Sequence, residues 1–111
     1  MTGTLIVLTT FASEEDAARV TRALVEERLA ACANLLPGAR SIYRWQGAVA
    51  DERETLALLK TGEREWPALR ARLAELHPYE VPECLAVRVE DGAPAYLAWL
   101  AASLASAPER G

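Results

Sequence analysis

The chain has 111 residues, of which 51% are hydrophobic and 25% charged, and its formal net charge is −4. A chain of this length forms one domain and buries roughly two-thirds of its unfolded surface. A hydrophobic core that needs no disulfide or metal cross-link is therefore expected. The acidic balance excludes a protein that tracks nucleic-acid phosphates. The apolar run 5–8 is too short for a signal or membrane segment, so no membrane contact and a cytoplasmic location are expected.

The first predicted elements are a strand and a helix. The continuous apolar and β-branched run 5–10 is typical of a buried central strand. Ser13 follows as an N-cap, and Asp16, three residues later, gives a pattern resembling a capping box. The apolar residues Ala17, Val20 and Leu24 then recur with the helical period.

A long hairpin is predicted after Cys32. Extended segments lie on both sides of Pro37-Gly38, which is either a full turn or a bulge in one long strand. Gln46-Gly47-Ala48 predicts the hairpin turn, and the return strand runs to Thr61. Such a ribbon is long enough to project beyond the body of the domain.

The remaining pattern predicts a helix, a short strand and a further helix. Apolar residues from Trp66 to Leu76 follow the helical period, and His77-Pro78 ends that helix. Residues 84–89 alternate as a strand, and Pro94 opens the last helix. The order β-α-β-β-α-β plus a terminal helix predicts an α+β, ferredoxin-like sandwich. We expect one domain over residues 1–105 and a flexible tail over 106–111.

The segment His77–Glu83 holds the most unusual group of residues. It contains the only histidine, a tyrosine, two carboxylates and two prolines. The prolines exclude a helix or a central strand, so the segment is a stiff connection. Two interpretations stay open at this point: a plain connector from helix to strand, or a functional loop held on a rigid scaffold.

This segment and Cys32 carry residue types that serve metal binding or catalysis. His77, Cys32, Glu80 and Glu83 are donors that suit copper or zinc, although their spacing matches no standard ligand pattern. A weak site completed by a neighbouring subunit is favoured over a dedicated site within one chain. The other interpretation of His77 is a helix-end residue, and that of Cys32 is a buried, inert thiol rather than a nucleophile.

Aromatic residues suggest a second type of site. Tyr43 and Trp45 are two residues apart on the hairpin and therefore share one of its faces. Together with Tyr79, they are residue types favoured in pockets and interfaces. Lys60 is either a buried cation that needs a partner or a side chain that reaches solvent at the end of its strand. The unpaired edges of the ribbon favour assembly over a monomer.

The sequence resembles the CutA family of divalent-cation tolerance proteins. The resemblance rests on motifs in one order along nearly the whole chain: 23–34, Pro37-Gly38, 41–47, 59–61, 77–83 and 96–100. It implies a ferredoxin-like subunit in a tight homotrimer similar to the PII signalling proteins, with the hairpins joining neighbouring sheets. It also implies a link to metal tolerance and no catalytic reaction.

The resemblance implies Cys32 and His77 as the matching metal donors. The family's pattern includes a further cysteine where this chain has Leu8-Thr9-Thr10, and a second histidine where it has Leu76. Only weak binding of Cu²⁺ or another divalent metal is therefore expected, and no cofactor is obligatory.

The sequence therefore predicts a cytoplasmic homotrimer that binds a ligand in clefts between subunits. The cleft is expected to be lined by Tyr43, Trp45, Lys60, His77, Tyr79 and Glu83. One rival is a PII-like module that binds a small anionic metabolite through Lys60 or Arg44. The other rivals are an enzyme of unknown reaction, with a strongly shifted pKa of His77 or Lys60 in the cleft, and a purely structural trimer.

Overall fold

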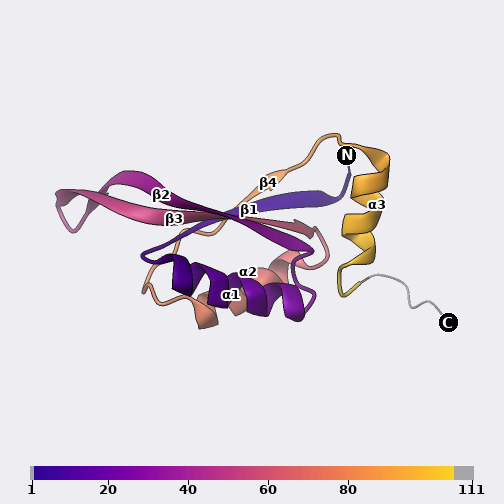
Figure 1. The fold of residues 1–111 in the computed structure, drawn as a ribbon, viewed down its shortest axis with the longest axis horizontal. Coiled ribbons are helices and arrows are strands. Elements are labelled where there is room, and N and C mark those ends of the chain that lie inside the picture. Colours follow the sequence, from indigo (N-terminus) through magenta and orange to yellow (C-terminus); the bar gives the residue numbers. More distant parts are fainter. Residues whose placement is uncertain (1, 107–111) are drawn as a thin grey trace.

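The structure, a computed structural model, describes residues 2–106 as a four-stranded antiparallel sheet with three helices (Figure 1). The strands lie in the order β2-β3-β1-β4, and the α+β class and the element order expected from the sequence are observed. The elements are β1 (Thr4–Phe11), α1 (Glu14–Glu26), β2 (Cys32–Trp45), β3 (Ala48–Gly62), α2 (Trp66–Leu76), β4 (Leu85–Arg88) and α3 (Pro94–Ala102).

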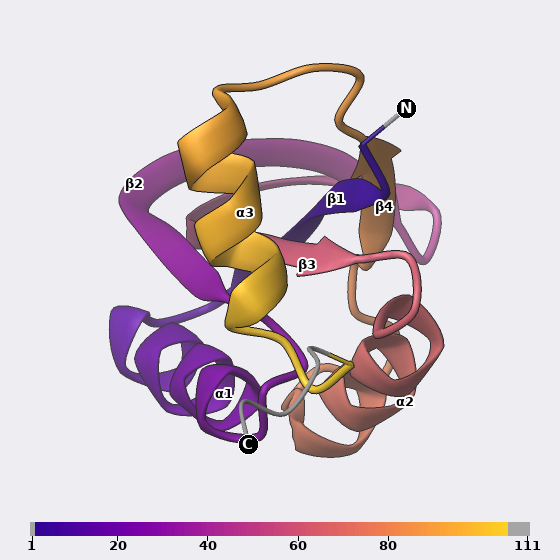
Figure 2. The same cartoon turned by 90° about the vertical axis from the view of Figure 1, so that its right-hand side faces the viewer.

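One face of the sheet is covered by α1 and α2, which lie on the same side of it (Figures 1 and 2). Val7, Phe11 and Leu59 point to this side and are fully buried. They pack against apolar side chains of both helices in the main core, because the alternation of a strand sends every second residue to one face. The core residues contributed by the helices are Ala17, Val20 and Leu24 of α1 and Leu69 and Leu73 of α2.

The start of α1 follows the predicted capping pattern. Ser13 has an extended backbone, and its hydroxyl accepts a hydrogen bond from the N–H of Asp16 at 3.1 Å. One of the four N–H groups without a helical partner is thereby satisfied. The acidic first turn, which includes Glu14 and Glu15, complements the positive end of the helix dipole. The cap fixes where the chain turns from β1 into α1.

The β2–β3 hairpin projects from the body as a long ribbon (Figure 1). The molecule measures 53 × 26 × 21 Å, and its radius of gyration of 14.8 Å exceeds the roughly 13 Å of a compact domain of this length. Gln46 and Gly47 form the turn with φ angles of 49° and 80°, as two-residue hairpin turns require. Between Leu36 and Ala39 the pairing with β3 shifts, so Pro37-Gly38 is a bulge within one strand.

The sheet face opposite α1 and α2 is less covered. Ile6 and Leu8 of β1 point to it and are only partly buried. Their partners on the edge strand β4, Val87 and Leu85, are 53% and 60% exposed. All four residues of β4 are exposed, so the predicted alternation of this strand produces no buried side within one chain.

The third helix lies at the end of the sheet opposite the ribbon tip (Figure 1). Leu100 and Leu104 pack on Ala31 in a small second cluster. No helix of residues 2–106 is long and apolar enough to cross a membrane. The predicted tail begins at Ser106, whose N–H donates to Glu65 Oε2 at 2.8 Å; residues 107–111 lie outside the described part of the chain.

Candidate functional site

A cavity of about 710 Å³ lies where the ribbon meets the segment after α2. Its walls come from the end of β1, from both strands of the ribbon and from residues 79–83, all within a single chain. The lining residues are Thr10, Ala12, Ser41, Ile42, Tyr43, Trp45, Glu52, Glu54, Tyr79, Glu80, Val81, Pro82 and Glu83. We refer to this cavity as the ribbon cleft.

The hairpin register places aromatic and acidic side chains on one face of the ribbon. Trp45 pairs with Ala48, Tyr43 with Ala50, and the next step pairs Ser41 with Glu52. Residues that pair across an antiparallel ladder, and their second neighbours, point to the same face. The Tyr43 hydroxyl donates to Glu52 Oε2 at 3.1 Å. Partial desolvation, with the Glu52 carboxylate as a second cause, raises the Tyr43 pKa.

A second phenol–carboxylate pair joins the loop to the ribbon. The Tyr79 hydroxyl donates to Glu54 Oε2 at 2.5 Å, and Glu54 is only 7% exposed. Loss of solvent around the phenol, together with the adjacent Glu54 charge, raises the pKa of Tyr79 far above its usual 10.0. Tyr79 therefore stays a neutral hydrogen-bond donor, and it holds the loop against the hairpin.

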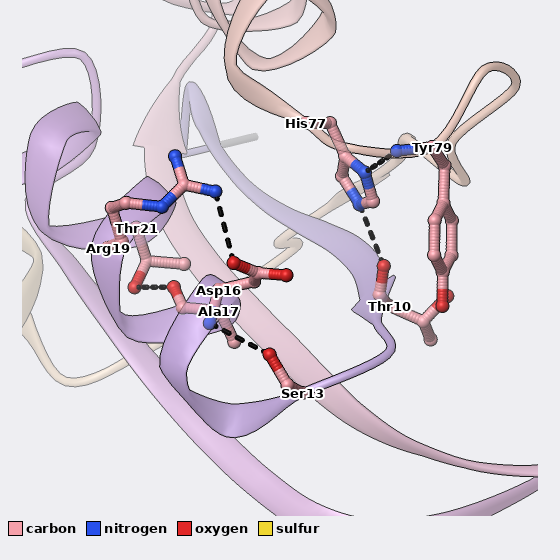
Figure 3. Close-up of polar contacts among 8 residues, drawn as sticks. All are labelled: Thr10, Ser13, Asp16, Ala17, Arg19, Thr21, His77 and Tyr79. Atoms are coloured by element: carbon pink, nitrogen blue, oxygen red, sulfur yellow. Dashed lines mark hydrogen bonds and ion pairs between the residues drawn. The ribbon is translucent and has the colours of Figure 1, made fainter.

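His77 is not among the residues that line the cleft; Figure 3 shows its ring bonded to Thr10 and Tyr79. Its ring stacks on Phe11 with centroids 4.3 Å apart and planes 12° from parallel. Nδ1 accepts the Tyr79 N–H at 3.0 Å, so the neutral ring carries its proton on Nε2 and donates it to the Thr10 carbonyl at 2.8 Å. Burial lowers the His77 pKa, and the Thr10 bond opposes this shift only in part.

His77 therefore has a structural role, joining the loop after α2 to the end of β1. Both ring nitrogens are occupied by backbone groups, and the side chain is 6% exposed. The residue ends α2 in an extended conformation, φ −71° and ψ 132°, as expected of a residue before proline. The ring thus fixes the start of the loop relative to the end of β1, and Tyr79 is placed two residues later.

Lys60 and Cys32 lie elsewhere, as a cross-strand pair on the sheet. Lys60 Nζ donates to Asn34 Oδ1 at 2.7 Å and lies 5.7 Å from the Tyr96 ring centroid. Cys32 Sγ is 3.6 Å from the Tyr96 hydroxyl. Of the six residues predicted for the cleft, the structure brings Tyr43, Trp45, Tyr79 and Glu83 together and leaves Lys60 and His77 outside.

The two predicted metal donors are not neighbours within one chain. Cys32 pairs with Lys60, which pairs with Ile6 on the partly open face, whereas His77 stacks on Phe11 of the helix-covered face. Ile6 and Thr10, which His77 contacts, are four residues apart on β1, a separation of about 13 Å. Among residues 2–106 no three His, Cys, Asp or Glu side chains are grouped so as to hold a metal ion.

Sequence reasoning did not select Glu52 and Glu54, although a signal was present. A two-residue turn at Gln46-Gly47 fixes the register of the whole outer ribbon. Counting from that turn places Glu52 opposite Ser41, on the same face of the ribbon as the next pair, Tyr43 and Ala50. The contact of Glu54 with Tyr79 depends on the packing of a distant loop, and no local pattern shows it.

Comparisons with known proteins give a consistent result. Residues 5–103 match the family model described as "CutA1 divalent ion tolerance protein". A Thermus thermophilus protein named divalent-cation tolerance protein CutA is 52% identical over 95 residues, covering 86% of this chain and 92% of the relative. The crystal structure of CutA from Xylella fastidiosa has a TM-score of 0.89 and 41% identity, and the match covers 92% of this chain and 98% of that one.

Proposed function

The chain belongs to the CutA family of divalent-cation tolerance proteins, and from this premise we propose that it is a homotrimeric binding protein whose ligand occupies the ribbon cleft. The carrying observation is the cleft itself, about 710 Å³ and lined by aromatic rings and carboxylates from the ribbon and from residues 79–83. Small-molecule sites are concave, largely preformed and few in a protein. The role proposed is binding rather than catalysis, because both nitrogens of His77 serve the fold.

Assembly into a trimer is supported by the surface that one chain leaves uncovered. Leu85 and Val87 on the edge strand β4 are more than half exposed, and Ile6 and Leu8 beside them are only partly buried. The opposite edge of the sheet is β2, the outer strand of the ribbon. Two open edges and an apolar face of this kind favour pairing with further chains. We also propose that a subunit with the strand order β2-β3-β1-β4 is a ferredoxin-like sandwich.

We propose that copper binding is weak and that Cys32 contributes more to it than His77. The Cys32 thiol is partly accessible, whereas a metal ion could reach His77 only if a ring nitrogen released its backbone partner. Thiolate and imidazole are both good ligands for copper. The two free thiols are compatible with a reducing compartment, which we propose to be the cytoplasm.

The rival proposal of an anionic metabolite finds less support at the cleft. Among the described residues that line it, four are glutamates and none is basic. Lys60 lies in a different part of the sheet, and Arg44 alternates with Tyr43 and Trp45 and so points to the other face of the ribbon. An anion in the cleft would meet like charges on several sides.

Light scattering tests the assembly on which this proposal depends. The expected mass is three times the 12.1 kDa of one chain. Val87→Lys places a charge on the proposed contact and should yield smaller species, whereas Ala74→Lys, on the exposed side of α2, should leave the mass unchanged. A wild-type mass of one chain would overturn the trimer.

Calorimetric titration with Cu²⁺ tests the metal proposal. We expect weak binding that is lost in Cys32→Ser and retained in His77→Gln, because the glutamine removes a donor that is already engaged. Binding that is lost only in the His77 variant would contradict the order proposed for the two donors.

A further inference from the structure

We propose that the ribbon cleft is a site for an organic cation, a substituted ammonium or guanidinium compound. The inference rests on the proposed function to the extent that it assigns a ligand class to the same cleft. It goes further because it excludes the anionic class and gives the cleft a ligand other than a chelated metal ion.

The first support is an uncompensated negative charge in the wall. Glu54 is 7% exposed, and among the described residues its carboxylate has one hydrogen-bond partner, Tyr79. Within residues 2–106 the Oε1 atom of Glu54 makes no hydrogen bond, and no ion pair involves this carboxylate. Oε1 is not among the buried atoms of the described residues, so it can be reached from outside, and a largely buried carboxylate is stabilised by a cation placed beside such an oxygen. The cleft is the side from which such a cation can approach.

The charge around the cleft has the same sign. Glu52, Glu80 and Glu83 also line it, and none of the described lining residues is Lys or Arg. The one other acidic side chain of β2 and β3 is paired: Asp51, the neighbour of Glu52, binds Arg40 through two hydrogen bonds. The cleft is therefore where unpaired negative charge collects on this part of the molecule.

The aromatic residues supply the second, independent support. Tyr43 and Trp45 are 38% and 46% exposed, and both line the cleft with Tyr79. The face of an aromatic ring attracts a cation through its quadrupole, and organic ammonium groups are recognised in this way. The hydroxyls of both tyrosines are already used by Glu52 and Glu54, so the ring faces are what they offer to a ligand.

The spacing of the carboxylates favours an organic cation over a metal ion. A divalent ion such as Ca²⁺ or Mg²⁺ needs several oxygens converging at about 2–2.6 Å. In residues 2–106 no three acidic, cysteine or histidine side chains converge in this way. Carboxylates spread around a cavity of about 710 Å³ suit a larger ion whose charge is diffuse and whose body contacts aromatic rings.

Titration with benzyltrimethylammonium chloride tests the proposal. Binding is followed by NMR line broadening of the probe, with sodium chloride at equal ionic strength as the background. We expect saturable binding of the ammonium and no binding of benzyl alcohol, which has the aromatic ring without the charge. Glu54→Gln, Glu52→Gln and Trp45→Ala should each weaken binding about tenfold or more, as expected when a charge or a ring face is removed.

Asp51→Asn is the matched control, because it removes one negative charge from the same strand on the opposite face of the ribbon. Its affinity for the probe should match that of the wild type. Glu52→Gln keeps the proposal falsifiable should Glu54→Gln impair folding, since Glu52 is exposed. Equal weakening by the control, or binding of benzyl alcohol as tight as that of the ammonium, would overturn the organic-cation site.

Light scattering of the same samples separates this inference from the proposed function. Probe binding by a monomer would contradict the trimer and support the cation site. A trimer that binds no probe would support the assembly and contradict the cation site. If the glutamine variants change the mass and no probe binds, a side chain of a second copy occupies the cleft, and the small-molecule proposal is overturned.

Discussion

The two faces of the sheet differ in how far one chain completes them. On the helix-covered face, Val7, Phe11 and Leu59 are fully buried, and the polar ring of His77 is stacked and hydrogen-bonded. On the other face, the edge strand β4 leaves Leu85 and Val87 more than half exposed. The comparison teaches that one chain forms a closed core on one side and an open surface on the other. Stability should therefore reside on the first side and assembly on the second.

The sharpest test of this comparison uses two adjacent leucines of β3. Leu59 points to the helices and is fully buried, whereas Leu58 points to the other face and is partly exposed. Leu59→Ala should lower the free energy of unfolding by about 2–5 kcal/mol, the usual cost of a core cavity. Leu58→Ala should act mainly on assembly, so light scattering on dilution should show dissociation in this variant first. Dissociation of Leu59→Ala before Leu58→Ala, under conditions where both are folded, would break the comparison.

The next largest effect is expected at His77. His77→Ala removes the stack on Phe11 and two hydrogen bonds, so it should destabilise the fold by about 2–4 kcal/mol. Urea denaturation measures the loss, and Glu75→Ala, an exposed position of α2, should change stability little. A loss at His77 no larger than that at Glu75 would show that the ring is not part of the closed side.

A smaller effect is expected where the closed side meets the cleft. Tyr79→Phe removes the bond to Glu54 and should cost about 1–2 kcal/mol, while Tyr96→Phe serves as a control on α3. Because folding raises the pKa of Tyr79 above 10.0, its contribution is complete below pH 10 and is lost as the pH rises further. Folding also raises the pKa of Tyr43, but less than that of Tyr79. Absorbance titration should therefore show a last-ionising tyrosine in the wild type that is missing in Tyr79→Phe. Identical curves would contradict the buried phenol.

The smallest expected effect is a loss of stability at acidic pH that depends on His77. Folding lowers the pKa of His77 below 6.5, so the unfolded chain takes up the proton first and stability falls as the pH drops below 6.5. The slope contributed by one such group is at most about 1.4 kcal/mol per pH unit. Urea midpoints at pH 7 and pH 5.5 should differ more in the wild type than in His77→Gln. Equal differences would mean that the ring is solvated in the folded state.

Much of the fold was predictable because its determinants are local. The Ser13 cap, the turn at Gln46-Gly47 and the end of α2 at His77-Pro78 are all set by neighbouring residues. The choice between a turn and a bulge at Pro37-Gly38 was not local. It depends on whether the chain on both sides continues to pair with β3, which it does.

The candidate site was predictable only in part. Tyr43 and Trp45 share a face by simple alternation, and Tyr79 and Glu83 follow from the stiff loop. The positions of His77 and Lys60 depend on contacts with residues far away in sequence, Phe11 for the first and Tyr96 for the second. A polar residue near a loop can point into a cleft or behind its wall, and only the packing of the whole chain decides which.

The dependence of unfolding on protein concentration tests the central claim most directly, namely that the open face is completed by further copies of this chain. If the open face is buried between copies, dilution weakens the native state by mass action, and the urea midpoint should fall with decreasing protein concentration. The midpoint of Val87→Lys should lie lower and should not depend on concentration. A wild-type midpoint that stays constant over a hundredfold dilution, with the mass of one chain throughout, would contradict the account.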